Sequence, residues 1–311
     1  GLAWATCEDD IKSMRENFLT VRGRLAEVKG KDGAIMDFLA AFVGANESVD
    51  KLYENSFSPK FKSMLSAYVL ACNKFAKQNP DKVWIKDVFP VTEKDVIAGY
   101  TVGLALMTNV PFAIMKISNG SIDKSSLATP KGSNGFAVNA NKTKDGNTYL
   151  GINSHQPLEG PYSWYEAHVH SDEGWDMLGG TFPGGVTIFH GANRNLGWAH
   201  TVSFADHDDV YKLRMHPTEK LTYFFDGKWL KLEEKKVRMW VKIWWIIKIP
   251  VTKKYYKSVY GPTLEKDGNY YSVRFVSAFD IRGAEQWYHM NKAKNFDEFQ
   301  TAVKEMKIPG L

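Results

Sequence analysis

The stretch Lys131-Gly132-Ser133-Asn134-Gly135-Phe136-Ala137-Val138 separates two parts of this chain that differ in the secondary structure their residues predict. A loop of small and polar residues, 118–131, leads into it. Two runs of strand-forming residues follow, 136–139 and 148–152, and the turn Lys144-Asp145-Gly146-Asn147 between them predicts a hairpin. We therefore predict a helical portion over residues 1–117, a linker over 118–132 and a strand-rich portion over 133–311.

Apolar spacing and capping signals predict the helices of residues 1–117. Ser58-Pro59 places a capping residue before a proline at the first helical position. Thr92 with Asp95 has the spacing of a capping box and predicts a helix to about Met107. One apolar stripe at helical spacing follows Pro59, and we interpret it as core: Phe61, Met64, Leu65, Tyr68, Val69, Cys72 and Phe75.

The portion after Ser133 predicts short strands joined by turns, and then a helix that begins near Asn295, where Glu298 completes a second capping pattern. Helices gathered in one portion and strands in the other predict the α+β class. The predicted strands cover residues 184–191, 197–202, 221–225, 237–251 and 270–279.

Composition excludes several kinds of protein. The net charge of +5 over 311 residues, with scattered lysines, does not indicate a nucleic-acid partner. A membrane span is not expected, because the longest apolar candidate, 237–251, contains Lys242, Lys248 and Pro250. Cys7 and Cys72 are either buried thiols or one bridge, and neither alternative is favoured.

Few standard catalytic signatures occur in this chain. It has no G-x-S-x-G, P-loop, G-x-G-x-x-G or H-E-x-x-H motif. His168 and His170 have no third ligand at a recognisable spacing, so structural or surface roles are favoured over zinc. A triad of Ser133, His155 and an aspartate has no local support, although spacing alone does not exclude it.

We interpret Gly132–Ser133 as a bond that the protein cleaves in itself, which leaves Ser133 as a new N-terminus. A serine hydroxyl is a weak nucleophile and needs a base. A free α-amino group, with a pKa of roughly 7.7–8.0, supplies one near neutral pH. Only an N-terminal serine carries both groups, so cleavage would create the catalyst.

The run Asp206-His207-Asp208-Asp209 has two interpretations. Carboxylates at 206 and 209, with the carbonyls between them, suit a hard cation such as calcium. The alternative is a polar turn at the start of a strand.

Several sequence blocks resemble the penicillin acylase family of N-terminal-nucleophile hydrolases, and most closely its acyl-homoserine lactone acylase and aculeacin acylase branch. The blocks follow the family's order over nearly the whole chain. They are residues 1–10, 21–24, 132–134, 153–157, 180–184, 191–193, 197–202, 260–262 and 285–290.

The resemblance implies a precursor that cleaves itself before the serine into a small and a large subunit. It implies a four-layer αββα sandwich and removal of an acyl chain from an amide-linked small molecule, such as an acyl-homoserine lactone, a β-lactam or a lipopeptide. No organic cofactor is implied. The chain starts without Met and with an apolar Gly1-Leu2-Ala3. We therefore expect a longer precursor with an export signal, and a periplasmic or secreted location.

The resemblance also implies roles for individual residues. Ser133 matches the nucleophile, and His155 matches the residue that holds its amine. The backbone N–H of Val202 matches a donor to the oxyanion. Asp206 and Asp209 match metal-binding carboxylates and the Asp208 carbonyl a further ligand, which makes calcium the expected metal.

The resemblance implies that relatives continue beyond the position of Leu311, where the oxyanion asparagine is expected. It also implies a small-subunit start and a further metal carboxylate that have no match in these 311 residues. Two hypotheses follow: an autoprocessing acylase, or a non-catalytic member that binds acylated ligands or acts as a scaffold.

Overall fold

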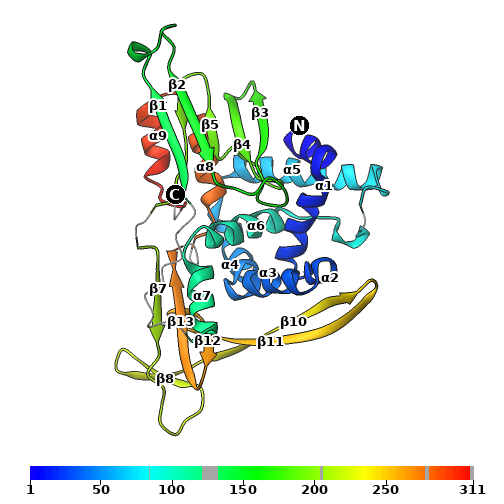
Figure 1. Cartoon of the computed structure of the whole chain (residues 1–311), viewed down its shortest axis with the longest axis vertical. Helices are drawn as coiled ribbons and strands as arrows, with labels where there is room; N and C mark the ends of the chain where they lie inside the picture. Colours follow the sequence, from blue (N-terminus) through cyan, green and yellow to red (C-terminus); the bar gives the residue numbers. More distant parts are fainter. Residues whose placement is uncertain (84, 121–131, 204–205, 277–279, 309–311) are drawn as a thin grey trace.

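The computed structural model describes residues 1–83, 85–120, 132–203, 206–276 and 280–308 (Figure 1). The N-terminal portion is helical, as predicted. Its elements are α1 (Leu2–Val21), α2 (Ala26–Lys29), α3 (Lys31–Phe42), α4 (Ala45–Ser56), α5 (Pro59–Gln78), the 3-10 helix η1 (Lys86–Val88), α6 (Glu93–Leu106) and α7 (Val110–Ser118).

The predicted caps are confirmed. The Ser58 side chain accepts the N–H of Phe61 at the start of α5, and Thr92 and Asp95 form a reciprocal capping box at the start of α6. The predicted stripe of α5 is buried at Phe61, Leu65, Tyr68, Val69, Cys72 and Phe75. These side chains pack on α1 and α6, because an amphipathic helix is stable only when its apolar face is covered.

Cys7 and Cys72 are both buried free thiols, which decides between the two alternatives left open by the sequence. Hydrogen bonding to Cys7, together with burial, raises the pKa of Cys72 far above its usual range.

The C-terminal portion holds the strands. They are β1 (Ser133–Val138), β2 (Tyr149–Ser154), β3 (Tyr165–Ser171), β4 (Trp175–Thr181), β5 (His190–Ala192), β6 (Gly197–Trp198), β7 (Asp208–Lys212), β8 (Thr222–Phe225), β9 (Lys228–Lys231), β10 (Glu233–Trp244), β11 (Ile247–Ser258), β12 (Gly261–Lys266) and β13 (Asn269–Phe275). The 3-10 helix η2 (Ala140–Lys142) lies between β1 and β2, and α8 (Gly283–Lys292) and α9 (Phe296–Val303) close the chain.

Every described strand pair is antiparallel. The strands form two larger sheets, β3-β4-β5-β6 and β10-β11-β12-β13-β7, and two hairpins, β1-β2 and β8-β9. The helices contact both larger sheets, since α2 and α3 pack on β10, while α1 packs on β3 and α8 on β4. Figure 1 shows the N-terminal helices between the two sheets.

Three strand predictions were wrong. The strand predicted over residues 197–202 covers only Gly197–Trp198. The single strand over residues 237–251 is a hairpin, with β10 and β11 joined at Trp245–Ile246, and the apolar run contains no glycine or asparagine to indicate that turn. Residues 184–189 form no strand. The Tyr100 hydroxyl accepts the N–H groups of Val186 and Thr187, so these groups do not pair with a neighbouring strand.

The main hydrophobic core takes side chains from both portions, including Phe61 and Leu65 from α5 and Phe189 and Trp287 from the C-terminal portion. The mixed helix and sheet class is confirmed, and the four-layer αββα sandwich stays a prediction. Most of the linker 118–132 lies outside the described residues, as do positions 277–279 of the last predicted strand.

Among the described helices, none is by itself long and apolar enough to cross a membrane. One pair bent by 66°, α6 with α7, passes that test together by length and composition.

Candidate active site

The hairpin β1-β2 carries Ser133 at its open end. The register places Ser133 opposite Ser154 and Phe136 opposite Gly151. The ring of Phe136 lies over Gly151, where a Cβ atom would come within 2.3 Å of it, so a larger residue at position 151 would displace that exposed ring. Gly132, the other residue of the predicted cleavage bond, is partly buried just before β1.

The side chain of Ser133 faces the β5-β6 region. Residues directly opposite in an antiparallel pair share a face, so Ser133 lies on the same face as Ser154. The Ser154 Oγ is 3.5 Å from the Nδ1 of His190 in β5. Gly135 shares this face by alternation, and a Cβ there would lie 3.0 Å from the Cβ of Ala199. The buried imidazole of His190, from another sheet, therefore lies against the face of the hairpin that carries Ser133.

The structure brings His155 close to the side chain of Asn134, the residue after Ser133. His155 follows β2 directly, and its Nε2 lies 3.2 Å from the Nδ2 of Asn134. The side chain of Asn134 points to the face of β1 opposite that of Ser133. The imidazole therefore contacts the face away from the hydroxyl, which does not favour a triad of Ser133 with His155.

Val202 lies in the irregular segment after β6 and is partly buried. It follows Ala199 by three residues, and Ala199 is the residue that touches β1 at Gly135. This places the segment of the predicted oxyanion donor near the serine strand.

The predicted calcium residues lie elsewhere, at the start of β7 in the five-stranded sheet. The Asp208 carboxylate accepts the N–H of Asn109, and the Asp209 carboxylate accepts the hydroxyl of Tyr211. Neighbouring strand residues point to opposite faces, so these two carboxylates do not converge. Burial raises the pKa of Asp208, and Asp206 nearby adds to that effect.

Among the residues with described positions, no group of three or more His, Cys, Asp or Glu side chains is arranged to hold a metal ion. Calcium at Asp206, Asp208 and Asp209 stays a prediction. His168 and His170 are exposed beside the Asp176 carboxylate, at 2.7 and 3.5 Å, and are likewise not part of such a group.

Two further histidines, His190 and His200, were given no role in the site by the sequence analysis. His190 is buried under the ring of Trp164, with the two ring centres 4.2 Å apart. The Nε2 of His200 accepts a hydrogen bond of 2.9 Å from the indole Nε1 of Trp287. Burial lowers the pKa of each imidazole to about 4. Both belong to predicted strands, but a lone histidine on a strand carries no sequence signal of burial.

These two imidazoles predict acid sensitivity. Their pKa in the fold lies below the ordinary value of 6.5, so the folded state disfavours their protonation. The fold is therefore stable with both imidazoles neutral. This contribution to the free energy of unfolding is complete above about pH 6.5 and is lost as the pH falls toward about 4. We expect the urea midpoint to fall over this range, and His190→Gln to reduce the fall. His168→Gln, at an exposed imidazole, should leave the fall of the urea midpoint unchanged. An equal reduction of the fall in both variants would contradict the role given to the buried His190.

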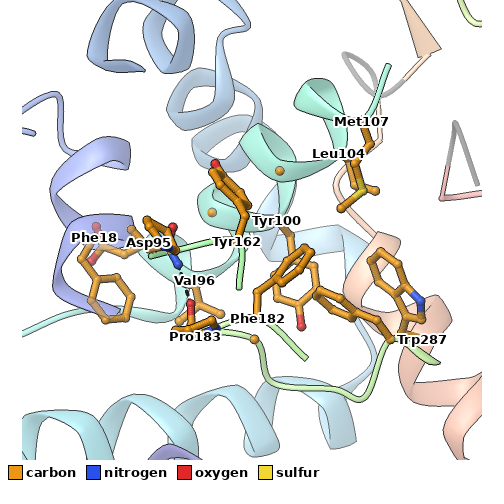
Figure 2. A pocket seen from close by; sticks show the side chains of 17 residues that line it. Phe18, Asp95, Val96, Tyr100, Leu104, Met107, Tyr162, Phe182, Pro183 and Trp287 are labelled. Atoms are coloured by element: carbon orange, nitrogen blue, oxygen red, sulfur yellow. Dashed lines mark hydrogen bonds between the residues drawn. The ribbon is translucent and has the colours of Figure 1, made fainter. Parts of the chain in front are cut away.

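An apolar pocket lies between α6 and the segment 182–189 (Figure 2). Its cavity volume is about 50 Å³. Its aromatic wall consists of Phe18, Tyr100, Tyr162, Phe182, Phe189 and Trp287.

Stacked rings connect the pocket to the serine face. Trp164 lies against His190 on one side and stacks on Phe182 on the other, with ring centres 4.4 Å apart. Phe189 stacks on Trp287 at the same separation. An apolar chain in this pocket would meet rings already fixed by the core.

The chain is similar to several known proteins. Acyl-homoserine lactone acylase PvdQ of Pseudomonas fluorescens strain Pf0-1 is 24% identical over 342 aligned residues, 97% of this chain and 44% of that protein. Aculeacin-A acylase of Actinoplanes utahensis is 26% identical over 171 aligned residues, 53% of this chain and 21% of that protein. A thermostable penicillin G acylase from Alcaligenes faecalis has a TM-score of 0.47 and 23% identity, over 54% of this chain and 30% of that one.

The chain spans less than half the length of these curated relatives. The model of the family described as penicillin amidase matches residues 1–311, the full length of the sequence. Because the family model matches the whole chain, this protein belongs to the penicillin amidase family.

Proposed function

We propose that this chain is the serine-bearing part of a hydrolase that removes an acyl chain from an amide-linked small molecule, with Ser133 as nucleophile. The supporting observation is the position of Ser133 on the hairpin face that it shares with Ser154, whose Oγ approaches His190, in a chain of the penicillin amidase family. Stacked rings link His190 to the aromatic pocket. The relatives named above are acylases, which favours this reaction class.

Cleavage of the Gly132–Ser133 bond is the first proposed step. It would divide the chain into a small subunit that ends at Gly132 and a large one that begins at Ser133. The main core draws on both portions, so the two pieces would stay together after the bond is broken. The proposed product has the four-layer sandwich of N-terminal-nucleophile hydrolases.

The new α-amino group would then act as base. It takes the proton of the Ser133 hydroxyl, and Oγ attacks the carbonyl carbon of the substrate amide. The backbone N–H of Val202 donates to the negative oxygen of the tetrahedral intermediate. The carbon–nitrogen bond breaks as the leaving amine takes the proton. Water then hydrolyses the acyl ester and releases a carboxylic acid. His155, which contacts the side chain of the adjacent Asn134, would orient the amine.

The pocket between α6 and residues 182–189 would receive the acyl chain. Burial of each methylene in such a site contributes about 0.8 kcal/mol, so chain length would govern affinity. Acyl-homoserine lactones lead the proposed substrates, ahead of β-lactams and lipopeptides. A calcium ion at Asp206, Asp208 and Asp209 and a periplasmic or secreted location remain parts of this proposal.

Intact-mass measurement of the purified protein tests the first step. We expect the 35.2 kDa chain to convert into two species with the masses of residues 1–132 and 133–311. The mass of the second species identifies Ser133 as its N-terminus. Persistence of the uncleaved chain on long incubation would argue for the alternative, a non-catalytic member that binds acylated ligands or acts as a scaffold.

A further inference from the structure

The hairpin β10-β11 ends in a run of exposed apolar side chains. Its strands extend beneath α2 and α3, and its tip reaches past α2 (Figure 1). Five consecutive residues, Ile243 to Ile247, are 46–83% exposed, with Trp244 at 72% and Trp245 at 79%. Such a run is rare on a protein surface unless another surface covers it.

The base of the hairpin is anchored in the fold, so the tip is held in place. Met239 and Val241 are buried against Ala26 of α2 and pack with Ala34 and Phe38 of α3. The Lys242 carbonyl lies 2.7 Å from where Gly30 would carry a Cβ, a contact that only glycine permits. The exposed tip is thus a continuation of an ordered hairpin.

The hairpin also concentrates the positive charge of the chain. Residues 233–258 carry eight Lys or Arg and two Glu, a net charge of 8 − 2 = +6, whereas the whole chain has +5. The rest of the molecule therefore has a net charge of −1. The segment from Lys242 to Lys248, which holds the apolar run, has no acidic residue.

The cations gather on the outward face. Alternation places Lys236, Arg238 and Lys242 of β10 opposite the face that packs on α2 and α3, and the register pairs Lys242 with Lys248 and Lys236 with Lys254. Like charges directly opposite each other are unfavourable in a sheet and are relieved by anions. Glu234 lies 3.4–3.5 Å from Lys236 and Lys254, and Glu27 lies 2.6 Å from Lys248, so part of this charge is already balanced.

We propose that the β10-β11 tip docks on the surface of an anionic lipid bilayer. Trp side chains favour the boundary between lipid headgroups and acyl chains, where the ring is buried and the N–H stays hydrated. Exposed isoleucines add apolar area, and Lys and Arg beside them attract anionic headgroups. The tip contributes Trp244, Trp245 and Ile246 to the boundary, while Lys242 faces the headgroups and Lys248 stays paired with Glu27. This proposal does not depend on the proposed hydrolase function.

Vesicle co-sedimentation of the full 311-residue chain tests the proposal. We expect binding to vesicles of equimolar phosphatidylcholine and phosphatidylglycerol, weaker binding to phosphatidylcholine alone, and a decline as salt screens the lysines. Lys242→Gln should weaken binding by up to about fivefold. The double variant Trp244→Ser with Trp245→Ser should reduce it by more than tenfold, as the loss of two interfacial tryptophans implies.

A matched control is Leu70→Ser on α5, an apolar side chain 69% exposed on another surface, which should bind vesicles as the parent chain does. Unchanged urea midpoints in all variants would show that they fold. The proposal is overturned if the parent chain stays in the supernatant with anionic vesicles, or if the tip variants bind equally well. Sedimentation velocity that shows tip-dependent dimers without vesicle binding would instead identify a second copy of the chain as the partner.

Discussion

Ser133→Ala is expected to abolish both cleavage before residue 133 and release of any acyl chain. The hydroxyl is the only proposed nucleophile for both reactions, so neither has a substitute route. Removal of the nucleophile from a serine hydrolase lowers kcat by a factor on the order of 10⁶. Intact mass should show one 35.2 kDa species, and a chromogenic acyl amide should give no release above the buffer rate.

Ser154→Ala is the most informative comparison for this variant. Ser154 lies opposite Ser133 on the same face and is the serine whose Oγ approaches His190. It stands inside a strand, so it lacks the α-amino group that cleavage would provide. We expect cleavage to persist in Ser154→Ala. Loss of activity in this variant, with activity retained in Ser133→Ala, would move the nucleophile to Ser154 and overturn the proposed mechanism.

Trp287→Ala is expected to give the largest loss of stability. The indole is 1% exposed, stacks on Phe189 and donates to His200. Truncation of a buried tryptophan costs about 3–5 kcal/mol through lost transfer energy and the cavity that remains. Since domains are stable by only about 5–15 kcal/mol, this change would remove a large share of the total. Urea unfolding followed by far-UV circular dichroism measures it.

Two controls separate the contributions at this position. Trp287→Phe keeps most of the ring stacking and loses the hydrogen bond to His200, so we expect a loss of about 1–2 kcal/mol. Trp245→Ala removes an indole that is 79% exposed and should change stability by less than about 0.5 kcal/mol. Equal losses at positions 287 and 245 would contradict the core role of Trp287.

Local signals in the sequence predicted the helical portion well. Ser58, Thr92 and Asn295 cap helices where the motifs placed them, because a cap depends on residues within one turn of each other. The stripe from Phe61 to Phe75 is buried because its spacing defines one helix face. The hairpin after Ser133 was also predicted, since its turn residues are adjacent in the chain.

Predictions failed where a distant group decides the backbone. Residues 184–189 have the composition of a strand, yet Tyr100, more than 80 positions earlier, accepts two of their N–H groups. The turn at Trp245–Ile246 has no glycine, proline or asparagine, so its position was not visible in the apolar run. His190 is buried and His200 is partly buried because Trp164 and Trp287 come from other elements to contact them.

The sequence by itself determined that this chain has a helical portion followed by a strand-rich portion, that Ser133 stands where the two meet, and which family it resembles. These features depend on neighbouring residues and on the order of short blocks. Only the tertiary structure decided which face Ser133 presents, that His155 lies on the other face, and that the Trp244–Trp245 tip is uncovered. Strand register and packing between distant elements set those positions, and no local pattern encodes them.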